Sequence, residues 1–395
     1  MKQFTDTVMT TDVLIVGAGP VGLALRIELE RLGVASMQID KHAAGLNTSR
    51  AAVIHARTLE VLEPGGTVPA LLAKGIKVPQ FHVRDRERDL LRIDFAHLPS
   101  SYPYALMCPQ NVTESIFQAR LDASGAEVLR PAELVSMETD DDGVVAEIAL
   151  PDGARHIRAK WIVGCDGMHS TVRSQAGIDF RGADYEEAFV LADVRMTWPI
   201  SRDEVTLFLA ASGLVVVAPL PEEDGASTNR FRIVATVASA TANPGIEVVQ
   251  SILDERGPRG SPVRVEKLIW SSRFGVEHRV ASDVYKGRIL LCGDAAHVHS
   301  PAGGQGMNTG IQDAVALAGP LKEAIGQGGC DALANWAARR QEIARDVVHM
   351  TDVMTRVATV SSSTARSLRN TALTLVGHIP FVQQKLAQRL AELGN

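Results

Sequence analysis

The first forty residues constrain the fold more than any other part of the chain. An apolar run, Val13–Val16, leads directly into the glycine-rich turn Gly17-Ala18-Gly19-Pro20-Val21-Gly22. A continuous apolar run of this length is typical of a strand buried in a parallel sheet. A helix is predicted from about Pro20 to Leu32, with Gly33 at its end. The segment therefore predicts a strand, a tight turn and a helix.

The spacing of the glycines and the acid that follows point to a bound dinucleotide. Gly17 permits the sharp turn, Gly19 lets the backbone approach a pyrophosphate, and Gly22 lets helix and strand pack closely. A second strand, Val34–Ile39, ends at Asp40, 18 residues after Gly22. An acid at this place accepts hydrogen bonds from the ribose of an adenosine. The predicted contacts are Gly17, Gly19, Pro20, Val21, Gly22, Asp40 and Lys41; the alternative is a tight turn that binds nothing.

A second turn of the same kind lies far along the chain. The apolar run Ile289–Cys292 ends at Gly293-Asp294, and a stretch with Pro301 and several glycines then leads into a helical pattern. A strand, a glycine-rich turn and a helix start place backbone N–H groups around an anion. One small molecule long enough to touch both turns is the simplest explanation of their joint presence.

A third constellation, Asp166-Gly167 with Ser170 and Arg173, follows an apolar strand that runs through Val163. Asp-Gly makes a turn, Ser170 can cap a helix, and Arg173 can reach a phosphate or pair with an acid. Taken alone, such a sequence is more often a simple turn than a site.

The whole pattern predicts an α/β chain with an interrupted organisation. A Rossmann-like dinucleotide-binding domain is expected from residues 1–77, 97–175 and 276–330, and a β-rich substrate domain from 78–96 and 176–275. Residues 331–395 are expected to be helical. Pro320 should kink or end the helix after the second turn, and Pro380 should divide the last segment into two short helices.

Composition narrows the function classes. The 395 residues carry a formal net charge of −6, which argues against nucleic acid as the main partner. The four cysteines lack metal-ligand spacing, so no metal is expected. Neither a signal core near Met1–Thr11 nor a long apolar span is visible, and a cytoplasmic protein without a membrane partner is expected.

The three motifs, in this order and spread over most of the chain, resemble those of the single-component FAD-dependent aromatic hydroxylases. These are the flavoprotein monooxygenases of the para-hydroxybenzoate hydroxylase type. The chain looks closest to the phenol and polyketide hydroxylase branch, and it stops before the thioredoxin-like C-terminal domain that many members carry. It also departs from relatives at Gly319-Pro320, where they continue with a Trp-Lys pair.

The resemblance implies a cofactor, its contacts and a reaction. It implies FAD, held by the first motif, by Arg50 and Gln110, by Asp166 and Gly167, and by the second turn. In that turn the implied contacts are Gly293, Asp294, Pro301, Gly304, Gln305, Gly306, Met307 and Asn308. It further implies that NADPH or NADH reduces the flavin and that O₂ then gives a flavin C4a-hydroperoxide, which hydroxylates a phenolic or related aromatic substrate.

Several points stay open at this level. No catalytic residue is assigned; His55, His297 and His299 are candidates for a base, against the simpler interpretation of histidines that pack or hydrogen-bond beside the cofactor. A flavoprotein reductase, an oxidase or a Baeyer–Villiger-type oxygenase on the same scaffold is the alternative enzyme, and a non-catalytic FAD-binding protein is the alternative of another class. The sequence does not distinguish a monomer from a homodimer.

Overall fold

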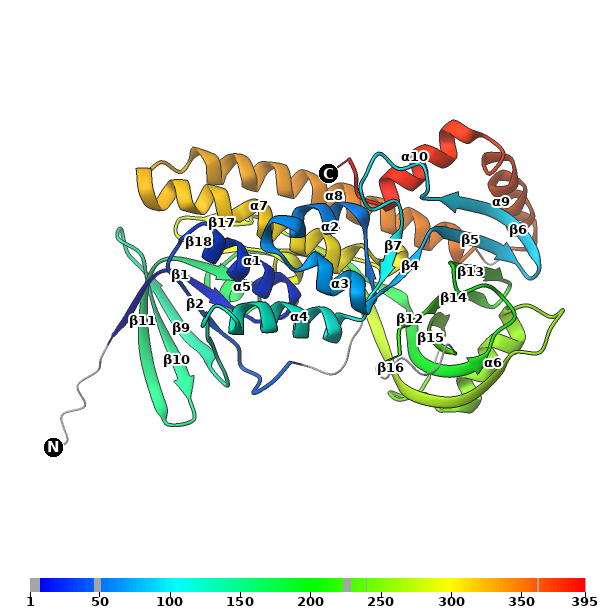
Figure 1. Ribbon diagram of the computed structural model, residues 1–395, viewed down its shortest axis with the longest axis horizontal. Helices are drawn as coiled ribbons and strands as arrows, with labels where there is room; N and C mark the ends of the chain where they lie inside the picture. Colours follow the sequence, from blue (N-terminus) through cyan, green and yellow to red (C-terminus); the bar gives the residue numbers. More distant parts are fainter. Residues whose placement is uncertain (1–7, 46–50, 223–228, 239, 361, 395) are drawn as a thin grey trace.

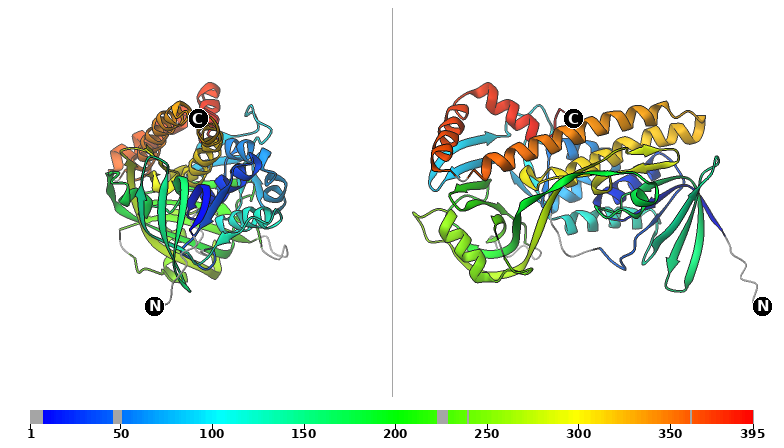
Figure 2. Two further views of the ribbon diagram at one scale, coloured as in Figure 1. Left: turned by 90° about the vertical axis from the view of Figure 1, so that its left-hand side faces the viewer. Right: turned by 180° about the vertical axis from the view of Figure 1, so that it is seen from behind.

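The computed structural model describes residues 8–45, 51–222, 229–238, 240–360 and 362–394 (Figure 1). It is an elongated molecule in which two large sheets lie one beyond the other along the long axis. Two long helices run side by side along the upper edge in the view of Figure 1, and the view from behind in Figure 2 shows the same arrangement. The α/β class predicted from the sequence is confirmed by this architecture.

The first sheet has eight strands and contains the predicted parallel unit. Its central order is β17-β18-β11-β1-β2-β8, and the hairpin β9-β10 extends from β11. Strands β18, β11, β1, β2 and β8 run parallel to their neighbours in that order. The bounds are β1 Met9–Val16, β2 Ser36–Ile39, β8 Val128–Leu129, β9 Glu133–Thr139, β10 Val144–Leu150, β11 Gly153–Gly164, β17 Tyr285–Lys286 and β18 Ile289–Leu291.

The second sheet also has eight strands, in the order β19-β16-β12-β15-β14-β13-β5-β6. The predicted hairpin in residues 78–96 forms β5 and β6, and β5 pairs in parallel with β13. The bounds are β5 Gln80–Asp85, β6 Arg88–Asp94, β12 Phe180–Thr197, β13 Glu204–Ala210, β14 Gly213–Pro219, β15 Arg230–Val237, β16 Arg264–Ala281 and β19 His297–Val298. Helix α6, Ile246–Arg256, covers one face of this sheet.

Strand alternation separates the two faces of the second sheet. Phe208, Val215 and Val217 belong to the buried cluster that packs against α6. Leu209 and Leu214 belong instead to a cluster on the opposite face, with Leu207 and Val216 half-buried against it. The set that faces the core beneath α6 is therefore Phe208, Val215 and Val217.

Smaller elements connect the two sheets. A three-stranded sheet consists of β3, β7 and β4. Its strands and the surrounding helices have the bounds β3 Val53–Ile54, β4 Ile76–Val78, β7 Ala105–Met107, α1 Pro20–Arg31, α2 Ala56–Leu62, α3 Val68–Lys74, α4 Gln110–Asp122 and α5 Thr171–Gln175, with 3₁₀ turns at η1 Glu63–Gly65, η2 Gly293–Ala295 and η3 Ala302–Gly304.

The C-terminal third is helical, as expected, with α7 Gln305–Gln327, α8 Asp331–Ala358, α9 Ser363–Val376 and α10 Pro380–Leu390. Pro380 begins α10 and so divides the last segment as predicted. The sequence predicts that Pro320 kinks or ends the preceding helix; the helix does not end there, because α7 continues through Pro320 to Gln327. Leu317 and Leu321, on either side of Pro320, are fully buried. Burying two such side chains offsets the roughly 3 kcal/mol that an internal proline costs.

None of the helices in the described ranges combines the length and the apolar character needed to cross a bilayer.

Candidate functional site

The three sequence motifs meet at one edge of the first sheet. Val16 at the end of β1 is in register with Gly164 at the end of β11, which is in register with Leu291 at the end of β18. The residues that follow these three strands therefore lie next to one another, at the carboxyl edge where α/β sheets bind ligands.

The first turn has the backbone geometry that a phosphate needs. Gly17 has a φ of 103°, and a Cβ there would collide with the carbonyl of Cys165. A Cβ on Gly22 would collide with the carbonyl of Gly17, so both positions require glycine. Gly19 differs, because a Cβ there would meet nothing within 4 Å. Its bare backbone faces open space at the start of α1, whose first N–H groups have no side-chain cap.

Asp40 is fixed beside this turn. One carboxylate oxygen accepts a hydrogen bond from the backbone N–H of Ala18 at 2.7 Å, and the other accepts from His42 N–H at 2.8 Å. The guanidinium of Arg130 donates to the Ala18 carbonyl at 3.0 Å and lies 3.6 Å from Asp40. Lys41 points to solvent. The sequence interpretation missed Arg130, although its place directly after the strand that ends at Leu129 is a signal for the same sheet edge.

Asp166 organises the third motif. One of its oxygens accepts hydrogen bonds from the N–H groups of Thr171 and Val172 at 2.8 and 3.2 Å, at the start of α5. Its other oxygen is buried without a protein partner. Burial raises the pKa of this carboxyl, and the hydrogen bonds from Ser170 and the backbone oppose the rise. This oxygen is therefore a buried acceptor at the carboxyl edge of the sheet that no described protein group satisfies.

The other two residues of the motif are structural. Ser170 caps α5 by accepting from the N–H of Arg173 at 3.0 Å, as predicted. Arg173 donates to the carbonyls of Ala295 and Met168 at 2.9 and 2.7 Å and stacks on Phe180. Its guanidinium thus ties the second and third motifs together through the backbone.

The second turn packs directly on the first. Val21 packs against both Gly293 and Gly310. A Cβ on Gly293 would lie 2.9 Å from a Val21 methyl group, and a Cβ on Gly310 would lie 2.7 Å from the same methyl group. Gly293 has a φ of 61°, and Asp294 beside it is exposed. The contact joins the start of α1 to Gly293 and to the second turn of α7, so the two glycine-rich segments pack against each other.

The turn before α7 is held in an unusual backbone conformation. Gly303 and Gly304 have φ values of 76° and 65°, and a Cβ on Gly304 would collide with Val53. The side chain of Asn308 secures the arrangement by accepting from His55 N–H at 2.8 Å and donating to the Val53 carbonyl at 2.9 Å. Gln305 begins α7, and no side chain caps its first N–H groups. Pro301 and Gly306 are half-buried, and Met307 is buried.

The three candidate histidines bond within the protein. His55 Nε2 donates to the Gly303 carbonyl at 2.8 Å, and burial lowers its pKa to about 4. His299 Nδ1 donates to the Ser300 carbonyl at 3.0 Å, and burial likewise lowers its pKa to about 4. His297 Nε2 lies 2.6 Å from a carboxylate oxygen of Asp313. This pattern fits histidines that support the turn.

Two predicted contacts remain, Arg50 and Gln110. Arg50 falls outside the described residues. Gln110 is the first residue of α4; its side chain donates to Glu114 at 2.8 Å and its backbone N–H to the Ala51 carbonyl at 3.0 Å. Ala51 is also contacted from the second sheet, where Arg232 donates to its carbonyl at 3.0 Å.

That arginine belongs to a buried ion pair that the sequence interpretation missed. Arg232 and Asp193, on the adjacent strands β15 and β12, form two hydrogen bonds of 2.7 and 2.9 Å and are 3 % and 5 % exposed. Charged residues in the middle of apolar strands are the signal that identifies such a pair. The pair fixes the second sheet against the segment around Ala51.

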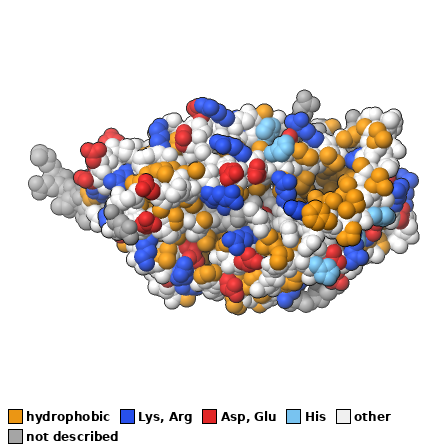
Figure 3. Space-filling model, turned by 90° about the horizontal axis from the view of Figure 1, so that it is seen from above, with side chains coloured by type: hydrophobic (Ala, Val, Ile, Leu, Met, Phe, Trp, Pro, Cys, Tyr) orange, Lys and Arg blue, Asp and Glu red, His pale blue; other side chains and the backbone are white. Residues whose placement is uncertain are grey.

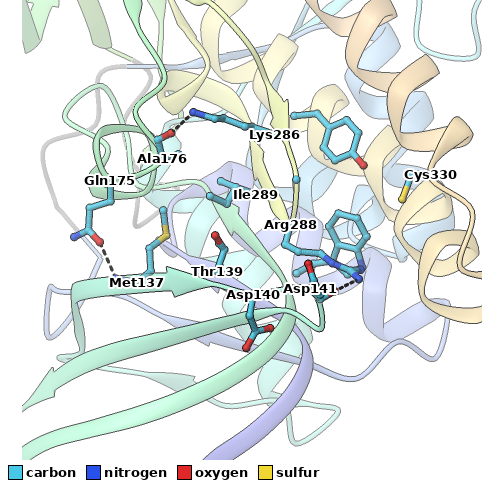
Figure 4. A pocket seen from close by; sticks show the side chains of 13 residues that line it. Met137, Thr139, Asp140, Asp141, Gln175, Ala176, Lys286, Arg288, Ile289 and Cys330 are labelled. Atoms are coloured by element: carbon cyan, nitrogen blue, oxygen red, sulfur yellow. Dashed lines mark hydrogen bonds between the residues drawn. The ribbon is translucent and has the colours of Figure 1, made fainter.

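A separate cavity of about 620 Å³ lies at the other end of the first sheet and contains none of the predicted site residues (Figure 4). The polar groups labelled there bond mostly to the protein itself. Lys286 donates to the Ala176 carbonyl at 2.7 Å, and Arg288 donates to the Asp141 carbonyl at 2.8 Å. The glycine-rich edge remains the stronger candidate site.

Comparisons with known proteins agree with this geometry. Residues 10–351 match the family described as FAD binding domain. The 6-methylpretetramide 4-monooxygenase of Streptomyces rimosus is 35 % identical over 384 residues, which cover 96 % of this chain and 68 % of the relative. The chain belongs to the FAD-dependent aromatic monooxygenases.

Two further monooxygenases show the range of the likeness. The pentachlorophenol 4-monooxygenase of Sphingobium chlorophenolicum is 31 % identical over 350 residues, covering 87 % of this chain and 64 % of that longer protein. The crystal structure of p-nitrophenol 4-monooxygenase from Pseudomonas putida superposes with a TM-score of 0.87 and covers 98 % of this chain and 99 % of that one, at 24 % identity. That superposition establishes the fold of an aromatic monooxygenase of similar length.

Proposed function

We propose that this monooxygenase uses NADPH or NADH and O₂ to hydroxylate a phenolic or related aromatic ring. The observation that carries the proposal is the contact of Val21, at the uncapped start of α1, with Gly293 and Gly310, which packs the first glycine-rich turn against the second turn and α7. Relatives named for a pretetramide and for pentachlorophenol support a substrate that carries a hydroxylated ring.

The residues at this edge fit FAD, and we assign them as its contacts. The bare backbone at Gly19, the orphaned oxygen of Asp166 and the exposed carboxylate of Asp294 offer complementary groups to a pyrophosphate and to sugar hydroxyls. The proposed set is the one expected from the sequence: Gly17, Gly19, Pro20, Val21, Gly22, Asp40, Lys41, Arg50, Gln110, Asp166, Gly167, Gly293, Asp294, Pro301, Gly304, Gln305, Gly306, Met307 and Asn308.

FAD, when bound, supplies the electron transfer and the oxygen activation. The chain contributes binding, orientation and a suitable electrostatic field. The first N–H groups of α7 and the positive end of its dipole would stabilise negative charge at the ring end of the cofactor. The first N–H groups of α1 would do the same for the pyrophosphate.

The substrate side is assigned to the second sheet. The face of that sheet opposite α6 carries the buried Phe189, Leu209 and Leu214 and half-buried apolar neighbours, which would exclude water from the reacting ring. In this proposal residues 1–77, 97–175 and 276–330 hold FAD, residues 78–96 and 176–275 hold the substrate, and residues 331–395 cover both.

The histidines near the turn are assigned a structural role. With pKa values of about 4, His55 and His299 are neutral at the pH where the enzyme works and offer hydrogen bonds rather than basicity. Ionisation of the substrate hydroxyl would then depend on the field of donors around it.

The test is to purify the protein with its flavin and follow NADPH and NADH oxidation across a panel of phenols, with mass analysis of products. A yellow protein with non-covalent FAD and a product heavier by one oxygen atom is expected. Substrate-stimulated oxidation that releases only peroxide would point to the reductase or oxidase alternative. A protein that neither contains nor takes up FAD would overturn the proposal.

A further inference from the structure

The α9–α10 surface, defined here as the outer face of residues 363–390, exposes unusually large apolar side chains. Leu368, Phe381 and Leu375 are 68 %, 67 % and 64 % exposed, and no other large hydrophobic side chain in the described ranges exceeds 48 %. Ile379 between them is 47 % exposed. Exposed apolar groups concentrated in one short segment indicate a place where something binds.

The same segment is charged with one sign only. From residue 353 to residue 391 the sequence has no Asp or Glu and has five basic residues, Arg356, Arg366, Arg369, Lys385 and Arg389. Arg356 pairs with Asp352 and Arg369 is buried against backbone carbonyls, so the exposed cations on α10 are Lys385 and Arg389. This contrasts with the net charge of −6 of the whole chain. Lys385 holds its ammonium group 5.5 Å from the centre of the Phe381 ring, so a cation and an exposed aromatic ring lie together.

The surface is continuous with the proposed site. On its inner side, Leu373 of α9 packs against the cluster of Leu90, Phe189 and Leu209 that forms the substrate face of the second sheet. The carbonyl of Leu390, at the end of α10, accepts a hydrogen bond of 3.2 Å from Gln305 at the start of α7. Figure 3 shows hydrophobic side chains gathered around a hollow on this side of the molecule, with basic side chains at its edge.

We propose that the α9–α10 surface is where the aromatic substrate first binds, and that it selects multi-ring aromatics with an ionised hydroxyl over single-ring phenols. This rests on the proposed function. An apolar surface that carries the exposed cations Lys385 and Arg389 matches a ligand that has a large π-face and a delocalised negative charge. A second copy of the chain fits less well, because a two-fold contact would place like charges opposite one another.

The experiment measures binding to the flavin-loaded enzyme by equilibrium dialysis, with alizarin as the three-ring probe and 4-nitrophenol as the single-ring probe. The double variant Leu375→Ser with Phe381→Ser should weaken alizarin binding about tenfold and 4-nitrophenol binding less than about twofold. Val135→Ser with Ile269→Ser is the matched control, since these side chains are 48 % and 41 % exposed on the distant strands β9 and β16. The control should bind both probes as the wild type does.

A charge-reversal pair tests the second half of the inference. Lys385→Glu with Arg389→Glu should weaken alizarin binding more at low ionic strength than at high ionic strength, whereas Lys267→Glu with Lys322→Glu should not. Both control lysines are exposed on other elements, β16 and α7.

Three results would overturn the inference. In the first, the wild type and the α9–α10 variants bind alizarin equally well. In the second, the wild type is a dimer and Leu375→Ser with Phe381→Ser converts it to a monomer. In the third, the wild type co-sediments with phosphatidylglycerol vesicles and that double variant does not. A wild type that binds alizarin through this surface but forms no oxygenated product supports the inference and refutes the proposed function instead.

Discussion

The imidazole Nε2 of His297 lies 2.6 Å from a carboxylate oxygen of Asp313, and both side chains are 3 % exposed. The other oxygen of Asp313 accepts a hydrogen bond from Arg340, whose guanidinium also reaches the Thr309 carbonyl at 3.3 Å. Burial alone would raise the pKa of Asp313, but Arg340 and His297 hold it below its usual value. One carboxylate therefore joins β19, α7 and α8 behind the second turn.

Replacing Asp313 with Asn should lower the free energy of unfolding by about 3 kcal/mol or more, because Arg340 is left as a buried charge without its counterion. Urea unfolding measures the loss, and Asp283→Asn at an exposed position serves as the control. Adding Arg340→Met should recover part of the loss, since the uncompensated charge is then gone. A double variant that loses the full sum of the two single effects would contradict this explanation.

Gly310→Ala should destabilise the protein by about 1–3 kcal/mol, although alanine normally favours a helix interior by up to about 1 kcal/mol. The new Cβ would lie 2.7 Å from a Val21 methyl group and 3.0 Å from the backbone of Gly293. FAD affinity should fall together with stability, because this contact sets the distance between the two turns. Thermal unfolding and flavin titration measure the two effects.

Gly319→Ala in the same helix is the matched control. A Cβ at Gly319 meets nothing within 4 Å, so the helix preference of alanine should raise the free energy of unfolding by up to about 1 kcal/mol. Equal effects of the two substitutions would show that the Val21 contact is not the cause.

Glu392→Gln should flatten the dependence of stability on pH. Glu392 is 1 % exposed, accepts from the Thr309 hydroxyl at 3.0 Å, and has a pKa that burial raises to about 8. The folded protein therefore holds a proton that the unfolded chain releases above about pH 4.5, and stability falls as the pH rises from about 4.5 to 8. The glutamine variant should gain a few kcal/mol relative to wild type at pH 8 and nothing at pH 4.

Urea unfolding at several pH values measures this difference. Glu323→Gln, at an exposed position of α7, should leave the slope of stability against pH unchanged. The opposite result would be a wild type whose free energy of unfolding rises between pH 5 and pH 8 while that of the glutamine variant does not. It would contradict the raised pKa of Glu392.

Asp294→Ala should weaken FAD binding about 10- to 100-fold, the range expected for the loss of a hydrogen bond to a charged group. Asp294 is exposed, so the fold should be unaffected. Flavin fluorescence titration measures the affinity, with Asp283→Ala as the control. Unchanged flavin content would refute the assigned role of Asp294.

The sequence predicts helices and strands well where apolar residues recur with a clear period and turn residues mark both ends of the segment. The sequence predicts strands at Val144–Leu150, Glu204–Ala210 and Arg230–Val237, because each segment lies between turn residues and is mostly apolar. These are the bounds of β10, β13 and β15. The edge where the three motifs meet was also foreseen, since strand ends in a parallel sheet lie together. The sequence predicts the two long strands only at Phe189–Trp198 and Val263–Trp270, whereas β12 begins at Phe180 and β16 continues to Ala281. The added residues have weak strand preference, but the two strands supply hydrogen bonds to each other there.

Contacts between segments that are distant in the sequence leave no local sequence pattern from which they could be predicted. The burial of Glu392 depends on Thr309 and Gln312, which lie 83 and 80 positions earlier, and nothing around Glu392 in the sequence marks it. The continuation of α7 through Pro320 depends on what Leu317 and Leu321 pack against. Arg50, which the family resemblance assigns to FAD, lies outside the described residues and stays a prediction.

The hairpin β5–β6 completes a sheet whose other strands are encoded much later in the chain, since Gln80 of β5 pairs with Glu204 of β13. During synthesis the hairpin emerges long before its partner strand and has no edge to join until then. Exchange of residues 176–275 between related genes would separate the sheet from this edge. We expect such hybrid proteins to form a complete second sheet only when the segment around β5 and β6 is exchanged together with residues 176–275.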